Sequence, residues 1–133
     1  MDFKDAFDLV LKQSAVVNEY WKFYSTVALA ILAATIGSDK LKSTRIGIGA
    51  LLAGFWIFSI GNLSAIAKGH ALTLSLAEVA NQVARATPLL TGLQTKLPSV
   101  GEVCGFHVLC DLGLTAAVLV VARHAWHQPP TAP

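Results

Sequence analysis

Three stretches of the chain carry almost no charge, and polar segments separate them. Residues 23–38 form an uncharged run of sixteen residues, and residues 46–67 form one of twenty-two. Residues 103–122 make a run of twenty in which Asp111 is the only charged residue. A helix needs roughly twenty apolar residues to cross the hydrocarbon of a bilayer. The pattern therefore predicts an all-α, polytopic membrane protein with three transmembrane helices.

Apolar positions recur at alternating steps of four and three before the first run and continue into it. This is the spacing of a helix face that packs against another helix. It predicts one helix over residues 2–36, with Gly37 as its C-terminal cap. The face comprises Phe3, Phe7, Val10, Ser14, Val17, Trp21, Tyr24, Ala28 and Ile31.

The second helix is predicted over residues 43–67, with Ser43 or Thr44 as its cap. It continues or re-forms to residue 87, shortly before Pro88, because proline ends helices. The same steps of four and three return in this second part, at Leu72, Leu76, Val79, Val83, Ala86 and Leu90.

The third helix is predicted over residues 99–126, where Ser99 and Glu102 match a capping box. Residues 128–133 form a proline-rich tail that suits neither helix nor strand. We therefore expect a single helical membrane domain over residues 1–127.

Three crossings place residues 2–22 and residues 68–90 on the same side of the membrane. These two amphipathic segments either extend the bundle as an antiparallel pair or lie flat on the membrane surface. The short loop on the other side holds Lys40, Lys42 and Arg45, which favours the cytoplasm by the positive-inside rule. The opposite side carries six basic residues but is longer. The balance favours an outside N-terminus and a cytoplasmic C-terminus.

Composition agrees with a membrane location and excludes other classes. Charged residues make up 14% of the chain, whereas soluble domains have about 25%. Hydrophobic residues make up 54%, and the mean hydropathy is +0.58. The first residues lack the pattern of a cleaved secretory signal. The net charge of +2 comes from scattered basic residues, so nucleic acid is not an expected partner.

Asp111 is the first candidate functional residue, together with His107. An aspartate in a lipid-spanning helix costs about 2.5–3.5 kcal/mol on insertion scales, so it normally faces protein or water and has a function. His107 lies four residues earlier, on the same helical face. The two side chains could line an ion path, relay a proton, or form a buried hydrogen-bonded pair.

A metal or cofactor site is not expected around this pair. Cys104 and Cys110 flank His107, but the group lacks enough ligands on other helices to surround an ion. On one helix the two cysteines lie about 9 Å apart along the axis, so we expect free thiols. The histidines are not placed for haem ligation, because His70 and His107 lie towards one membrane face and His124 and His127 towards the other.

The second candidate is a stripe of small residues on the second helix. Small side chains at heptad spacing let helices approach closely in a membrane. The stripe, interrupted by Ile57, comprises Gly47, Ala50, Gly54, Gly61 and Ser64. It predicts a helix-packing seam. Asn62, inside the same run, is expected to hydrogen-bond to another helix.

No catalytic motif is present in the sequence, so we expect a non-enzymatic protein. One hypothesis is a homo-oligomer that forms a pore or ion path lined by Asp111 and gated by the extramembrane helices. The alternative is an accessory or scaffold subunit of a larger membrane-protein complex. A small transporter or membrane enzyme is a third class, although a transporter would normally show an internal repeat.

Overall fold

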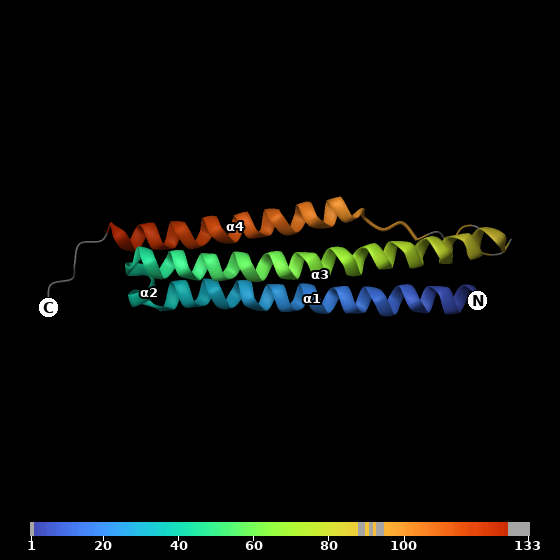
Figure 1. Cartoon of the computed structure of the whole chain (residues 1–133), viewed down its shortest axis with the longest axis horizontal. Helices are drawn as coiled ribbons and strands as arrows, with labels where there is room; N and C mark the ends of the chain where they lie inside the picture. Colours follow the sequence, from blue (N-terminus) through green and yellow to red (C-terminus); the bar gives the residue numbers. More distant parts are fainter. Residues whose placement is uncertain (1, 88–89, 91, 93–94, 128–133) are drawn as a thin grey trace.

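The computed structural model describes residues 2–87, 90, 92 and 95–127, which form four helices and no strand. The helices are α1 (Phe3–Gly37), α2 (Asp39–Ser43), α3 (Arg45–Ala86) and α4 (Val100–Trp126). Figure 1 shows a long rod in which α1, α3 and α4 run side by side. The N-terminus lies at one end of the rod, and α2 lies at the other with the last turn of α4. The all-α prediction is confirmed for this part of the chain.

Two helices are long and apolar enough to cross a membrane, judged by length and composition. They are α3 and α4, whose most apolar windows have mean hydropathies of 1.8 and 2.0. Only 22% of each window is buried within the fold, unlike the core helix of a soluble protein. Among the described helices α1 is not part of this set, because its uncharged run is only sixteen residues long and contains five hydroxyl side chains.

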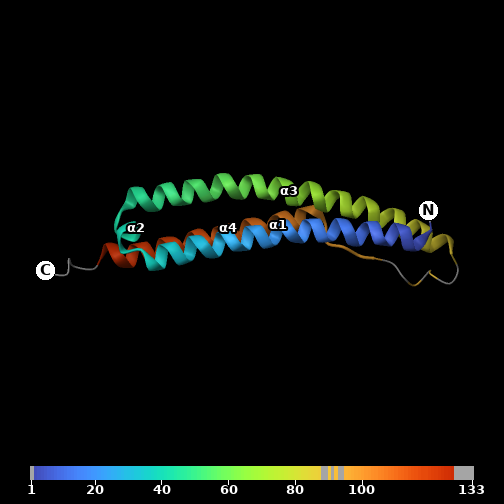
Figure 2. The same ribbon diagram turned by 90° about the horizontal axis from the view of Figure 1, so that it is seen from below.

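The half of the rod nearest α2 is a bundle of three helices. Figure 2 shows α3 as a bowed helix on one side, with α1 and α4 together on the other, so the bundle is triangular in section. Its apolar core joins all three helices through Tyr24, Ile31, Ile48, Phe55, Leu114, Val118 and Ala122.

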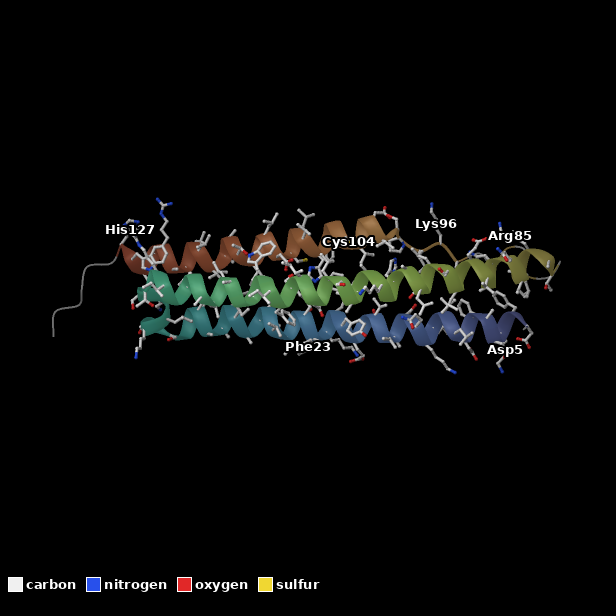
Figure 3. All side chains as sticks on the ribbon, in the orientation of Figure 1. Asp5, Phe23, Arg85, Lys96, Cys104 and His127 are labelled. Carbon is white, nitrogen blue, oxygen red and sulfur yellow. The ribbon has the colours of Figure 1, made fainter. Side chains whose placement is uncertain are left out.

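In the other half of the rod α1 and α3 are the only long helices, and we call this half the stalk. α1 has 35 residues and α3 has 42, which correspond to about 52 and 63 Å at 1.5 Å per residue. In Figure 3 the labelled Asp5 and Arg85 lie together at the stalk end, far from His127. α3 continues through the stalk without a break, so its second part extends the bundle.

The packed face of α1 is the predicted one, whereas that of α3 is not. Val10, Val17, Tyr24 and Ile31 of α1 are all buried. On α3 the predicted Leu72 and Val79 are 50% and 39% exposed. The buried positions are each one residue after a predicted one: Thr73, Ala77, Ala80 and Ala84. The prediction was wrong because it selected the largest apolar residues, whereas small side chains allow α3 to lie close to α1.

The two helices approach closely at Gly69. A Cβ atom added there would lie 2.9 Å from Cγ2 of Val17, which is closer than real side chains come. The Nε2 atom of Gln13 also donates a hydrogen bond to the Gly69 carbonyl, at 3.3 Å. A larger residue at this position would therefore force Val17 or the helix backbone to shift.

The connection between α1 and α3 differs from the predicted loop, because it contains α2. Gly37 is the last residue of α1, and no described glycine has a positive φ, so the predicted glycine cap is wrong. Ser38 makes the turn instead, and its Oγ accepts a hydrogen bond from the Leu41 amide at 3.2 Å. Thr44 precedes α3, but its hydroxyl lies near the Leu41 carbonyl and makes no capping bond.

The segment before α4 runs back along α3 and is tied to it. Asn81 donates from Nδ2 to the Thr95 carbonyl at 3.1 Å and accepts from the Thr95 amide at 2.9 Å. The Ser99–Glu102 capping box is confirmed, with bonds of 3.2 and 2.6 Å. The predicted stop at Pro88 and the tail at 128–133 lie outside the described residues.

Candidate functional site

A cluster of polar side chains lies inside the three-helix half, and we call it the polar centre. α4 contributes His107 and Asp111, α3 contributes Ser59 and Asn62, and α1 contributes Tyr24. His107 is 0% exposed and Asp111 is 1% exposed, and the other three side chains are also buried. The helix register brings them together, since 111 and 107 are one turn apart on α4, as are 59 and 62 on α3.

The carboxylate of Asp111 accepts hydrogen bonds from all three helices. Tyr24 donates its hydroxyl to Oδ1 at 2.8 Å, and Ser59 donates its hydroxyl to Oδ2 at 2.6 Å. His107 Nδ1 lies 3.2 Å from Oδ2. Hydrogen bonds to an ionised group contribute about 1.5–3 kcal/mol each. The protein thus replaces with its own donors much of the water that a buried carboxylate loses.

The second ring nitrogen of His107 fixes how the protons are arranged. Nε2 of His107 lies 3.4 Å from Nδ2 of Asn62, which can only donate. Nε2 therefore accepts, and the proton of a neutral imidazole sits on Nδ1, where it is donated to Asp111. This assignment follows the orientation of the Asn62 amide, whose Nδ2 faces the imidazole. Both ring nitrogens of His107 then have a hydrogen-bond partner, Asp111 at Nδ1 and Asn62 at Nε2.

Aromatic rings enclose the polar centre. The Tyr24 ring lies 4.3 Å from the His107 ring, and the Trp21 ring lies 5.3 Å from it, both measured between centroids. Phe55 packs against Tyr24 at 6.2 Å. Rings at these distances leave little room for water beside the imidazole, and hydrogen bonds strengthen where water is excluded.

The polar centre has the groups to hold or pass a proton. Among the described residues no group of three His, Cys, Asp or Glu side chains could hold a metal ion. Cys104 and Cys110 are free and half-buried. Both belong to α4 near the centre, and Figure 3 shows Cys104 near the N-terminal end of that helix.

The predicted small-residue stripe lies elsewhere, on the outer side of α3. Ala50, Gly54, Gly61 and Ser64 are exposed. A Cβ added at Gly54 or Gly61 would meet nothing within 4 Å. Gly47 differs, because a Cβ there would lie 2.6 Å from the Thr44 hydroxyl at the turn after α2. Within one chain the stripe is therefore not a packing seam, and its surface is available to another molecule.

Two members of the polar centre were not identified from the sequence. Tyr24 had been assigned only to the apolar face of α1, and Ser59 had no assigned role. A signal for Ser59 was present, since it lies three residues before Asn62 on the same face of α3. For Tyr24 the sequence offered no comparable sign.

Comparison with known proteins gives no further guide to the class of this protein. No family model, curated protein or solved structure matches the chain.

Proposed function

We propose that the protein is a non-enzymatic integral membrane protein with three spans, which associates with further copies of itself through the outer side of α3. The observation that carries the proposal is the exposed stripe of Ala50, Gly54, Gly61 and Ser64 on the most apolar part of that helix. Lipid offers no hydrophobic drive for helix association, so close approach at small residues is a main source of affinity.

Packing supports a third span in α1. Tyr24 and Ile31 are buried against α3 and α4 in one apolar core. If α3 and α4 cross the hydrocarbon, this half of α1 lies at the same depth. Its outer side is also apolar, since Phe23, Leu29 and Ile36 are 58%, 66% and 60% exposed. Lipid would cover these side chains, although the apolar run is short.

In this arrangement the stalk projects from one membrane face. The hydrocarbon core takes up about 30 Å of helix, which leaves about 30 Å of α3 outside it. The stalk carries most of the charged residues of α1 and α3, including the exposed ion pair of Arg85 and Glu78 at 2.7 Å. It is a suitable element for receiving a signal or for contacting a second protein.

The test is a pair of leucine substitutions on α3. Gly54→Leu should reduce cross-linking between copies in membranes several-fold, because leucine would separate the proposed interface. Ala53→Leu is the matched control, since Ala53 is also exposed but lies off the stripe. A Cβ at Gly54 has open space around it, so the substitution leaves the fold of one chain intact. Equal cross-linking in both variants would refute the proposed interface.

An accessory subunit of a larger membrane complex is the second candidate, and the polar centre favours it over a carboxylate-lined pore. Asp111 has three donors within its own chain, so a ring of copies is not needed to accommodate the carboxylate. The same stripe on α3 would then face a different membrane helix. Particle mass in mild detergent separates the candidates: a multiple of 14.1 kDa supports self-association, and a lone protomer supports a different partner.

A further inference from the structure

The end of the rod that contains α2 carries the excess positive charge of the molecule. This α2 end comprises residues 34–52 and 114–127, with Lys40, Lys42, Arg45 and Arg123 against one carboxylate, Asp39. Apart from Asp111, the remainder of the chain has six basic and six acidic residues and is balanced. The α2 end therefore has a formal charge of about +3, whereas the remainder of the rod is close to neutral.

A cavity of about 360 Å³ lies at this end, between α2 and α4. Val120, Val121 and Ala125 of α4 give it an aliphatic wall, and Lys42 and His124 provide the polar groups. The Lys42 side chain is 25% exposed and is held in place by two contacts. Its Nζ lies 2.7 Å from Oδ1 of Asp39 and donates to the Ile36 carbonyl at 3.3 Å. A fixed ammonium group thus stands beside an apolar hollow.

An aromatic residue and a second cation mark the same level of the bundle. The Arg45 guanidinium lies 5.4 Å from the centroid of the Trp126 ring. Trp126 directly follows the cavity residue Ala125 in α4. Tryptophan and arginine are typical of the depth at which lipid headgroups lie. The aliphatic wall suits an acyl chain of a phospholipid, and the fixed Lys42 ammonium suits its phosphate. The Arg45–Trp126 pair lies at the depth expected for the headgroup.

We propose that this cavity binds an anionic phospholipid, with the lipid phosphate beside Lys42 and an acyl chain against Val120 and Val121. The inference rests on the proposed membrane location. Cationic side chains at the surface of an anionic leaflet each contribute about 1 kcal/mol, and basic hollows between helices favour anionic headgroups. Free phosphate shares the charge but cannot cover the aliphatic wall, so the lipid is the better fit. Bacterial and eukaryotic cytoplasmic leaflets alike expose such lipids, which agrees with a cytoplasmic α2 end.

The test is native mass spectrometry of the full chain in detergent, with equal amounts of phosphatidylglycerol and phosphatidylcholine. The protein should retain phosphatidylglycerol preferentially. Lys42→Gln should lower that preference about fivefold, which corresponds to the contribution of one lysine. Lys42→Arg should keep it. Lys12→Gln is the matched control, because it removes one exposed lysine from the stalk and should change nothing.

A gain-of-function variant guards against a loss caused by misfolding. Asp39→Asn removes the carboxylate that competes for Lys42 and should strengthen retention of phosphatidylglycerol. Unchanged preference in Lys42→Gln, or an equal loss in Lys12→Gln, would overturn the proposal. Displacement of the lipid by excess inorganic phosphate would overturn it as well, since the site would then be one for the free anion.

The failure of this inference can be distinguished from failure of the proposed function. If alkaline carbonate releases the protein from membranes, the membrane location itself is wrong. If the protein stays in the membrane fraction but shows no preference between the two lipids, only the lipid site is wrong.

Discussion

Tyr24 links α1 to the polar centre by a hydrogen bond. Among the described residues its hydroxyl is the one donor to Oδ1 of Asp111. Buried donors to an ionised group contribute more than neutral pairs do. In membrane proteins, however, single side-chain hydrogen bonds average about 0.6 kcal/mol and reach about 1.7. Tyr24 should lie near the upper end of this range, because removing its hydroxyl leaves Oδ1 buried without a donor.

Tyr24→Phe should therefore destabilise the fold by about 1–2 kcal/mol. The measurement is thermal unfolding in detergent, followed by circular dichroism. Tyr20→Phe is the control, since Tyr20 is 36% exposed and should have almost no effect. Similar losses in the two variants would mean that the hydroxyl of Tyr24 contributes nothing beyond its ring.

Asp111→Asn should be tolerated better than Asp111→Leu. An asparagine can accept from Tyr24, and its amide can donate to Ser59, whose hydroxyl is able to rotate and accept, while the bond from His107 is lost. Leucine leaves three buried donors without an acceptor, at about 1–3 kcal/mol each. Size-exclusion chromatography and melting curves should show an assembled but less stable Asn variant and a largely misassembled Leu variant. If leucine equals or exceeds asparagine in stability, the polar centre has no structural role.

His107 and Asp111 could be paired from sequence because they share one helix, where spacing alone fixes the shared face. Tyr24 and Ser59 could not be paired with them. Their meeting depends on how α1 and α3 are rotated about their axes, and a single sequence carries no record of that rotation. The same limit explains the small-residue stripe: its spacing was visible, but whether it faces inward or outward was not.

At the level of the elements, the crossing of α1 and α3 depends on small side chains more than on leucines. The stalk core contains Ala6, Val10, Ala77 and Ala80. Heptad spacing predicted the helices and the packed face of α1 correctly. It missed the face of α3, because on that helix the alanines and the leucines follow the same spacing on adjacent stripes.

Gly69→Ala should destabilise the α1–α3 pair. Its Cβ would press on Val17 at 2.9 Å, and crowding of this kind costs about 1–3 kcal/mol. The gain in helix propensity offsets up to about 1 kcal/mol of that cost. Gly49→Ala on the same helix meets nothing within 4 Å and should be neutral or stabilising. The melting temperatures of the two variants are compared. An unchanged melting temperature for Gly69→Ala would mean that α1 and α3 can move apart at this contact at little cost.

At the level of the whole molecule, the rod has a stalk end and an α2 end, which the proposed function assigns to opposite sides of the membrane. Lys12 and Lys40 are exposed and lie at the two ends. The arrangement follows from three antiparallel long helices, and the sequence predicted it from the three uncharged runs. Composition selects only α3 and α4 as candidate spans among the described helices, whereas α1 joins them through packing contacts.

Single cysteines at positions 12 and 40 should react with a membrane-impermeant reagent from opposite sides. The background for both is Cys104→Ser with Cys110→Ser, which removes the two native thiols. Position 12 should be labelled from outside in intact cells, and position 40 only after the membrane is opened. Labelling of both positions from one side would exclude the three-span arrangement.

The polar centre also has a consequence for how such a chain would be assembled during synthesis. Of the described helices, α4 leaves the ribosome last, yet two of the three donors to its aspartate belong to the earlier α1 and α3. Entering lipid alone, α4 would bear most of the cost of a carboxylate that has His107 as its one partner on that helix. Beside two helices already in place, it meets a tyrosine and a serine hydroxyl as it enters. Correct biogenesis of the protein would then be sequential, with the first two long helices acting as the template on which the last one is accepted into the bilayer.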